Sequence, residues 1–420
     1  MTINFKTVFY LLICRFLIDI LYYFISFKIY SYQGYSANLE LYLVNLPISL
    51  FFIFPFIFND EKNNISNYLI FILLIGILLP LSSLFAFGAS PLSWYLINLI
   101  SFSFIVIMNN LMSNMHLDVP HLNNFNLFKI AFYSFYIIST LVFISKYGIK
   151  INLSNFSLTS ELIYSQRGLF KDSNPGYLIL NFFTLGPPLL FAYSIVYRKF
   201  FLTTISLILT LIVFSTSSEK SLLFSMALYL GVFLIHIFFN NVNQKNLLKS
   251  YIFMILSASS IYFINPILST LFINRLIFTP QLVSSFYYEY FQKYDYSYFL
   301  DTSIFSLFFG KSYHTSISRE LGRSLFSDET NLNAGLIADG FSKLGITGVI
   351  IVCIVFILIL KIVDIFSNNK NNLFVKLLMT FSFFAMINSS IFTVFFTSGL
   401  FLSIIFLILL PLNKKIISEK

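Results

Sequence analysis

The chain has 420 residues, of which 58% are hydrophobic and only 10% are charged. Soluble domains carry about 25% charged residues, so this composition excludes a soluble protein and predicts a chain that crosses a membrane several times. The net charge of +9 comes from basic residues spread over many short polar segments. Such spreading suits membrane topology and anionic lipid head groups and does not indicate nucleic-acid binding. Cys14 and Cys353 lie in apolar runs, where they indicate neither a disulfide nor a metal site.

Apolar runs of the length that a spanning helix needs recur along the chain. The first run lacks a small-residue cleavage site, which favours a span over a cleaved signal peptide. Asn388, Ser389 and Ser390 weakly interrupt the end of the chain, so its last two runs could also form one broken re-entrant pair. We predict about twelve spans, near residues 8–27, 41–58, 67–87, 92–111, 127–147, 176–197, 200–216, 221–239, 249–271, 343–365, 373–390 and 394–411.

Lysine and arginine in the short connections gather on one side of this arrangement, which should face the cytoplasm together with both termini. Two longer segments, 148–175 and 272–342, then fall outside as enlarged loops. The fold predicted is therefore an all-α polytopic membrane protein with a single transmembrane domain over 1–420. The second loop is aromatic and carries both signs of charge, and long loops are often functional.

The first outer loop carries Arg167 and Lys171 just before the turn Asn174-Pro175-Gly176. An arginine beside a helix start at the membrane face is a good phosphate ligand, although an interfacial anchor has the same composition. The hairpin 215–221 brings serines and Lys220 to the same face. Lys220 could line an anionic site or simply pair with Glu219.

The large loop begins with Arg275, and an aromatic strip follows around Glu289, formed by Tyr287, Tyr288, Tyr290 and Phe291. Tyrosine at this depth is typical of an interfacial belt. It could equally form a platform on which a sugar ring stacks while the hydroxyls donate hydrogen bonds.

Asn333 and Asp339 lie just ahead of the span that begins near Lys343, and His314 is the histidine of this loop. Asp339 could be a helix-start acid with only an electrostatic role, or a general base near the membrane surface. His314 is the other candidate base, against the alternative of a solvated loop histidine. No glycine-rich phosphate loop, paired-aspartate metal motif or zinc spacing is present, so we expect no cofactor and no metal.

These segments together resemble the O-antigen polymerases, the oligosaccharide repeat-unit polymerases of the Wzy type. The resemblance is carried by the layout of about a dozen spans with two enlarged outer loops. It is also carried by four local stretches, at 167–176, 215–221, 274–291 and 333–349.

The resemblance implies a metal-independent glycosyltransferase in the bacterial inner membrane whose active site faces the periplasm. Its donor and acceptor would both be oligosaccharides linked to undecaprenyl pyrophosphate, and a chain-length regulator is an expected partner. Arg275 and Arg167 would bind the pyrophosphate with help from Lys220, and Asp339 or His314 would accept the acceptor proton. Lys171, Asn174, Tyr287, Tyr288 and Asn333 complete the predicted substrate site.

Two alternatives stay open at the level of sequence. An O-antigen ligase would share the lipid-linked donor and the layout, but would transfer the glycan to a lipid-A core. A flippase for lipid-linked oligosaccharides should place charges within its spans, along a pathway. Here the notable charges near a span are Arg15 and Asp19 of the first apolar run, which favours an enzyme working at the outer face.

Overall fold

The computed structural model describes residues 5–59, 64–113, 125–148, 176–300, 316–326 and 330–412. These residues form helices and no strand, and ten of the helices are long and apolar enough to cross a membrane. The prediction of a polytopic helical membrane protein is therefore confirmed. The last two predicted spans differ from the rest: α19 (Asn372–Ala385) is shorter than a span, and α20 (Ile391–Thr397) and α21 (Leu400–Leu409) are bent by 60°. Counting that bent pair as one span gives up to eleven crossings in the described ranges, below the twelve predicted.

The chain that we predicted as a single transmembrane domain contains two compact units. Unit 1 comprises residues 1–115, 243–361 and 386–391, and unit 2 comprises residues 116–242, 362–385 and 392–420. Residues of each unit contact one another more than they contact the other unit, so each unit has its own buried core.

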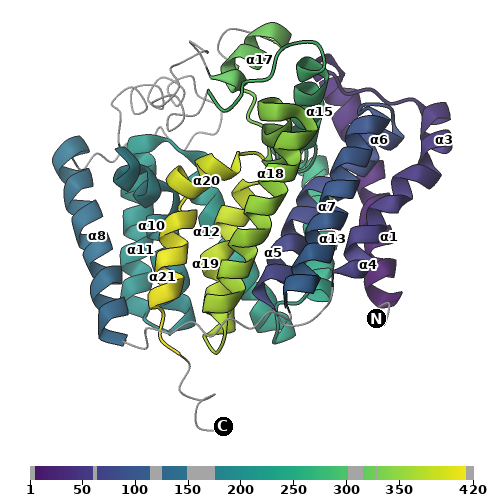
Figure 1. Ribbon diagram of the computed structural model, residues 1–420. Coiled ribbons are helices and arrows are strands. Elements are labelled where there is room, and N and C mark those ends of the chain that lie inside the picture. Colours follow the sequence, from purple (N-terminus) through teal and green to yellow (C-terminus); the bar gives the residue numbers. More distant parts are fainter. Residues whose placement is uncertain are drawn as a thin grey trace. The chain divides into compact units, whose positions relative to one another are not determined.

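Unit 1 is built around the helical rod from Ile65 to Ala86, which is almost entirely buried and strongly apolar. Such a helix is apolar on all sides because its neighbours surround it. The helices of unit 1 are drawn in Figure 1. They are α1 (Phe5–Leu21), η1 (Tyr22–Phe27), α2 (Lys28–Tyr30), η2 (Ser31–Gln33), α3 (Leu39–Ser49), η3 (Leu50–Phe52), α4 (Ile53–Phe58), α5 (Ile65–Leu73), η4 (Leu74–Leu78), α6 (Leu79–Ala86), α7 (Leu92–Ser113), α13 (Gln244–Ile264), α14 (Pro266–Ile273), η6 (Asn274–Phe278), α15 (Thr279–Phe291), α17 (Ile317–Leu325) and α18 (Leu336–Ser367) as far as Lys361.

The segment predicted as the large outer loop, 272–342, is substantially helical. A continuous helical rod runs from Pro266 through the π-helical turn η6 to Phe291, and α17 and the start of α18 follow. Residues 301–315 and 327–329 lie outside the described residues. Hydrophobicity along the sequence does not reveal these helices. They are short and carry charges of both signs, so no long apolar run marks them.

These helices form a layer over the end of unit 1 where α6 ends and α7 begins. The layer, here named the cap layer, comprises α15, residues 292–300, α17, residues 330–345 and residues 386–391. Trp94 Nε1 at the start of α7 donates to Ser284 Oγ of α15 (3.1 Å), and the hydroxyl of Tyr287 donates to the carbonyl of Leu332 (2.7 Å). Figure 1 shows α15, α17 and the start of α18 gathered in this layer.

Glycines bring the segment 386–391 into close contact with the rest of unit 1. A Cβ on Gly76 would lie 2.2 Å from Ile387 Cδ1, and a Cβ on Gly335 would lie 2.3 Å from the Ile387 carbonyl oxygen. The amide of Leu336 also donates to the carbonyl of Met386 (3.0 Å). The start of α18 is thus held against a loop far along the chain, at a position where a side chain on Gly335 would not fit.

Unit 2 holds a broken helix in place with polar side chains of α10. The carbonyl of Phe396 accepts from Asn181 Nδ2 (2.8 Å), and the carbonyl of Thr397 accepts from Thr184 Oγ1 (3.1 Å). Gly399 has a positive φ of 83° at the break, where it packs on Leu185. Carbonyls freed by a break inside a membrane need such partners. The helices of unit 2 are α8 (Phe125–Tyr147), α10 (Gly176–Val196), α11 (Phe200–Ser217), α12 (Lys220–Phe239), α19, α20 and α21.

Candidate functional site

The structure brings some of the predicted site residues into the cap layer and leaves others elsewhere. Tyr287, Tyr288, Asn333 and Asp339 lie in the cap layer, and Arg275 lies in η6 of the same helical rod as the two tyrosines. Lys220 begins α12 and so belongs to unit 2. The remaining predicted residues lie outside the described part of the chain; they are Arg167, Lys171, Asn174 and His314.

Asp339 and Lys343 form a buried ion pair at the start of α18. Lys343 Nζ lies 3.4 Å from Asp339 Oδ1, and the two residues are 2% and 8% exposed respectively. The acid stands in the first helical turn and precedes the base by four residues, which is the favourable orientation with respect to the helix dipole. The sequence interpretation named Asp339 but not its partner, although the four-residue spacing was visible.

The helix breaks immediately after this pair. Leu344 and Gly345 have non-helical angles, and the φ of Gly345 is +61°. A Cβ there would lie 2.8 Å from the hydroxyl oxygen of Tyr296. Beyond the break the chain packs back so closely that a Cβ on Gly348 would lie 2.0 Å from the carbonyl oxygen of Gly340. The turn carrying Asp339 is therefore a short helical segment set off from the long helix that follows.

Residues 297–299 stabilise the break from outside the helix. The amide of Ser297 donates to the carbonyl of Ser342, and the amide of Tyr298 donates to the carbonyl of Lys343, both at 3.0 Å. These carbonyls would otherwise be the unsatisfied last acceptors of a helix. Tyr298 and Phe299 both have positive φ, at 51° and 65°. Backbone held in this region by non-glycine residues costs about 1–3 kcal/mol each and clusters at functional sites.

Tyr287 and Tyr288 are buried among other residues of unit 1. The ring of Tyr288 stacks on Trp94 with centroids 5.2 Å apart and contacts Phe341 at 4.9 Å, and its hydroxyl accepts from Gln292 Nε2. In this structure neither ring presents a face on which a sugar could stack. The sequence does contain a signal for the burial of these two tyrosines. Positions 284, 287, 288 and 291 share one face of a helix, and all four residues are buried in α15.

Arg275 and Asn333 are exposed and do not contact the ion pair. Arg275 makes no hydrogen bond or ion pair with another residue that the structure describes. An exposed guanidinium can bind a phosphate, but no hydrogen bond or ion pair between described residues joins Arg275 to Asp339. The predicted grouping of Arg275 with Asp339 therefore rests on the sequence alone.

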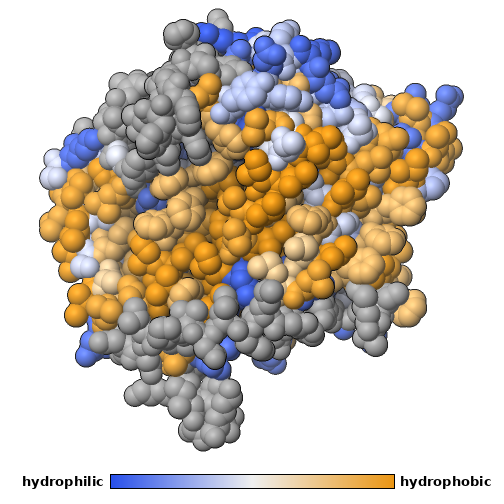
Figure 2. Space-filling view, in the orientation of Figure 1, coloured by the Kyte–Doolittle hydropathy of each residue, from blue (hydrophilic) through white to orange (hydrophobic). Residues whose placement is uncertain are grey.

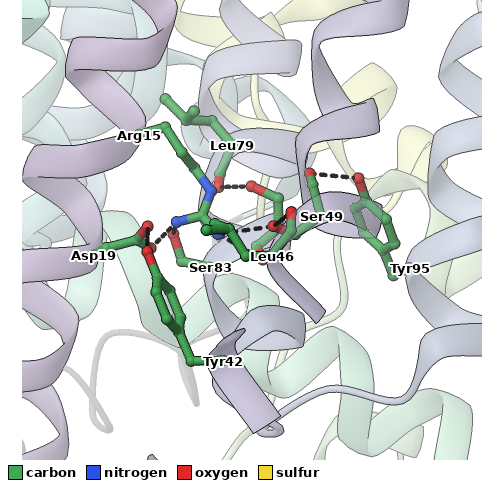
Figure 3. A network of polar contacts seen from close by, with 9 residues as sticks. Arg15, Asp19, Tyr42, Leu46, Ser49, Leu79, Ser83 and Tyr95 are labelled. Atoms are coloured by element: carbon green, nitrogen blue, oxygen red, sulfur yellow. Dashed lines mark hydrogen bonds and ion pairs between the residues drawn. The ribbon is translucent and has the colours of Figure 1, made fainter. Parts of the chain in front are cut away.

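A second buried ion pair of unit 1 is formed by Arg15 and Asp19 of α1 (Figure 3). Arg15 is 2% exposed and Asp19 is 6% exposed. Arg15 Nη1 donates to Ser83 Oγ of α6 (2.8 Å), and the hydroxyl of Tyr42 in α3 donates to Asp19 Oδ2 (2.9 Å). Charges inside a membrane protein are costly and commonly functional, so this pair is a second candidate site.

Further bonds tie this network to the surrounding helices. Arg15 Nη2 donates to the carbonyl of Ser82 (3.0 Å) and to Ser49 Oγ (3.3 Å). The hydroxyl of Tyr95 in α7 donates in turn to the carbonyl of Ser49 (2.8 Å), as Figure 3 shows. Two helices, α3 and α6, thus supply partners to the arginine and the aspartate, and α7 bonds to one of those partners, which is the arrangement expected of a structural clasp.

No protein-family model, curated protein or solved structure matches this chain. The chemistry must therefore be argued from the two buried pairs and their surroundings. Within the described ranges, no three His, Cys, Asp or Glu side chains gather as a bound metal ion would require.

Proposed function

We propose that this protein is a membrane glycosyltransferase that joins oligosaccharide repeat units carried on polyprenyl pyrophosphate, as the O-antigen polymerases do. The observation that carries the proposal is the Asp339–Lys343 pair in the cap layer. A carboxylate is held there, largely shielded from water, at one end of a bundle of apolar helices. Lipid-linked substrates require a site of this kind, because the lipid stays in the membrane while the glycan lies above it.

The reaction assigns a role to each charge. The hydroxyl of the acceptor sugar gives its proton to Asp339 as its oxygen attacks the anomeric carbon of the donor. The bond from that carbon to the pyrophosphate oxygen breaks, and polyprenyl pyrophosphate leaves with the electron pair. The transition state resembles an oxocarbenium ion, by analogy with glycoside hydrolysis. Lys343 neutralises the buried carboxylate, and Arg275 stabilises the charge that develops on the pyrophosphate.

The hydrogen bonds made by Arg15 and Asp19 favour an enzyme over a flippase. A transport pathway needs charges that a passing substrate can reach. Arg15 and Asp19 are bound to Ser83, Ser82, Ser49 and Tyr42 of their own unit. The polar atoms of this pair already bond to other groups of the protein, which fits a structural role.

The test is reconstitution of the purified protein in phospholipid vesicles with lipid-linked repeat units extracted from source cells that lack this protein. A polymerase converts them into a ladder of longer lipid-linked glycans, which gel electrophoresis and mass spectrometry resolve. A ligase lengthens nothing and transfers the single unit only when a lipid-A core acceptor is added. A flippase moves the units across the bilayer without changing their size. Unchanged glycan length in the absence of a core acceptor would overturn the proposal.

Arg275→Ala tests the predicted pyrophosphate contact within the same assay. We expect long glycans to disappear while the amount of folded protein stays the same, because the side chain is exposed. Lys28→Ala, which removes an exposed cation of unit 1 outside the cap layer, is the control. Wild-type glycan lengths in Arg275→Ala would exclude Arg275 from the site without excluding the reaction.

A further inference from the structure

We propose that Tyr290 and Tyr294 form a subsite that holds a sugar ring of the growing glycan, with Glu320 beside it. The inference rests on the proposed function and moves the predicted sugar platform from the buried Tyr287 and Tyr288 to the end of α15. It adds Tyr294 and Glu320, to which neither the sequence interpretation nor the proposed reaction assigns a role.

The two rings stack on each other, so Tyr290 supports the exposed ring of Tyr294 from one side. Their centroids are 4.4 Å apart and their planes are inclined by 28°. Tyr294 follows Tyr290 by four residues, just beyond the end of α15, so both rings lie on the same side. Tyr294 is 59% exposed. A large aromatic side chain this exposed is available to a ligand, whereas Tyr288 is enclosed by Trp94 and Phe341.

Glu320 of α17 supplies a hydrogen-bonding group at the edge of the stack. The hydroxyl of Tyr290 donates to Glu320 Oε1 (3.3 Å). A carboxylate has two oxygens and about four lone-pair directions, so Glu320 can accept a further bond from a sugar hydroxyl. An aromatic face bordered by an acceptor matches a sugar ring, which has apolar C–H faces and a rim of hydroxyls.

The charges around the stack favour a neutral ligand over an anionic one. Three acids and three bases lie on α15, residues 292–300 and α17, so their formal charges cancel. They are Glu289, Asp295, Glu320, Lys293, Arg319 and Arg323. A phosphate-bearing lipid head group would call for an excess of basic residues.

The surroundings also distinguish the stack from an interfacial tyrosine belt. Belt tyrosines border the apolar surface that faces the lipid. Figure 2 shows hydrophilic residues gathered over α15 and α17, away from the apolar surface of the spanning helices. The neighbours Glu289, Lys293 and Asp295 are all exposed, so the aromatic surface sits within a polar one.

The experiment compares Tyr294→Ala with the wild type in the vesicle assay, with the same extracted lipid-linked repeat units as probe. Loss of one aromatic contact should weaken glycan binding by about two- to tenfold. The growing chain should then be released earlier, and the mean glycan length should fall at least about twofold. The rate of the first joining step should stay near the wild-type value, because Asp339 and Lys343 are unchanged. Tyr294→Phe keeps the ring and should restore the length.

Tyr32→Ala is the matched control, because Tyr32 is 75% exposed, lies beside Tyr30 and is not part of the stack. It should leave the length distribution unchanged. If the wild type polymerises and the glycans made by Tyr294→Ala and Tyr32→Ala have equal lengths, the subsite is overturned and the proposed function stands. A wild type that forms no polymer would instead overturn the proposed function and the subsite with it.

Discussion

Two buried ion pairs of unit 1 share the same four-residue spacing but have different surroundings. Arg15 and Asp19 lie within α1 and are bonded to side chains and a carbonyl of α3 and α6. Asp339 and Lys343 occupy a short helical turn that ends at once in a break. The spacing of a pair thus says little about its role. The comparison suggests that the pair clasped by several helices serves the fold and the pair beside broken backbone serves the chemistry.

The cost of disturbing each pair follows from these surroundings. A buried ion pair is weak evidence for stability, but removing one partner leaves an uncompensated buried charge. Besides Asp19, Arg15 has three hydrogen-bond partners on α3 and α6, so its loss should affect several helices of the unit. Asp339 is paired with Lys343 within one short helical turn, so its loss should disturb that turn more than the rest of the bundle.

The largest effect on stability is expected from Arg15→Met. The change leaves Asp19 buried without its cation and should lower the free energy of unfolding by about 3–5 kcal/mol. Thermal unfolding in detergent, followed by circular dichroism, measures the loss. The double variant Arg15→Met with Asp19→Leu removes both charges and should be less destabilised than the single one. A double variant that is less stable than Arg15→Met would contradict a clasp made by this pair.

A smaller effect is expected from Gly345→Ala at the break behind Lys343. The positive φ and the nearby Tyr296 ring oppose a Cβ, and the strain should cost about 1–3 kcal/mol. Polymerisation should fall as well, because the turn that carries Asp339 is displaced. Gly231→Ala in α12 is the control, since nothing lies within 4 Å of its added Cβ. Equal activity in the two variants would show that the break does not position the pair.

The smallest effects come from a pair of buried tyrosines that each donate to a backbone carbonyl. Tyr95→Phe removes a bond to Ser49 beside Arg15, and Tyr287→Phe removes a bond to Leu332 in the cap layer. Each change should cost about 1 kcal/mol of unfolding free energy. Only Tyr287→Phe should also lower polymerisation, as the vesicle assay can show. A loss of activity in Tyr95→Phe alone would reverse the roles assigned to the two regions.

Most of the spanning helices could be predicted from the sequence because apolar runs of spanning length are a local signal. The same reasoning placed Asp339 correctly at the start of a helix. It did not reveal the helices within 272–342, because α15 and α17 are short and carry charges such as Glu289 and Arg319. Composition over a window cannot distinguish such helices from an irregular loop.

The parts of the site that escaped prediction depend on contacts between distant residues. Arg15 bonds to Ser83 and Ser49, which are 68 and 34 residues away. Such partners leave no pattern near Arg15 in the sequence. The break at Gly345 likewise depends on Tyr296 and on the amides of 297 and 298. Nothing within the apolar run that follows Lys343 indicates it.

The most direct test compares Asp339→Asn with Asp19→Asn in the vesicle assay, with activity expressed per amount of folded protein. Both changes remove one carboxylate charge from a buried pair. Loss of a general base typically costs 10²- to 10⁴-fold, so Asp339→Asn should lower the rate of joining by about 100-fold or more. Asp19→Asn should yield less folded protein, but what folds should join repeat units at close to the wild-type rate. A wild-type rate in Asp339→Asn, or an equal loss in both variants, would contradict the assignment of the chemistry to the cap layer.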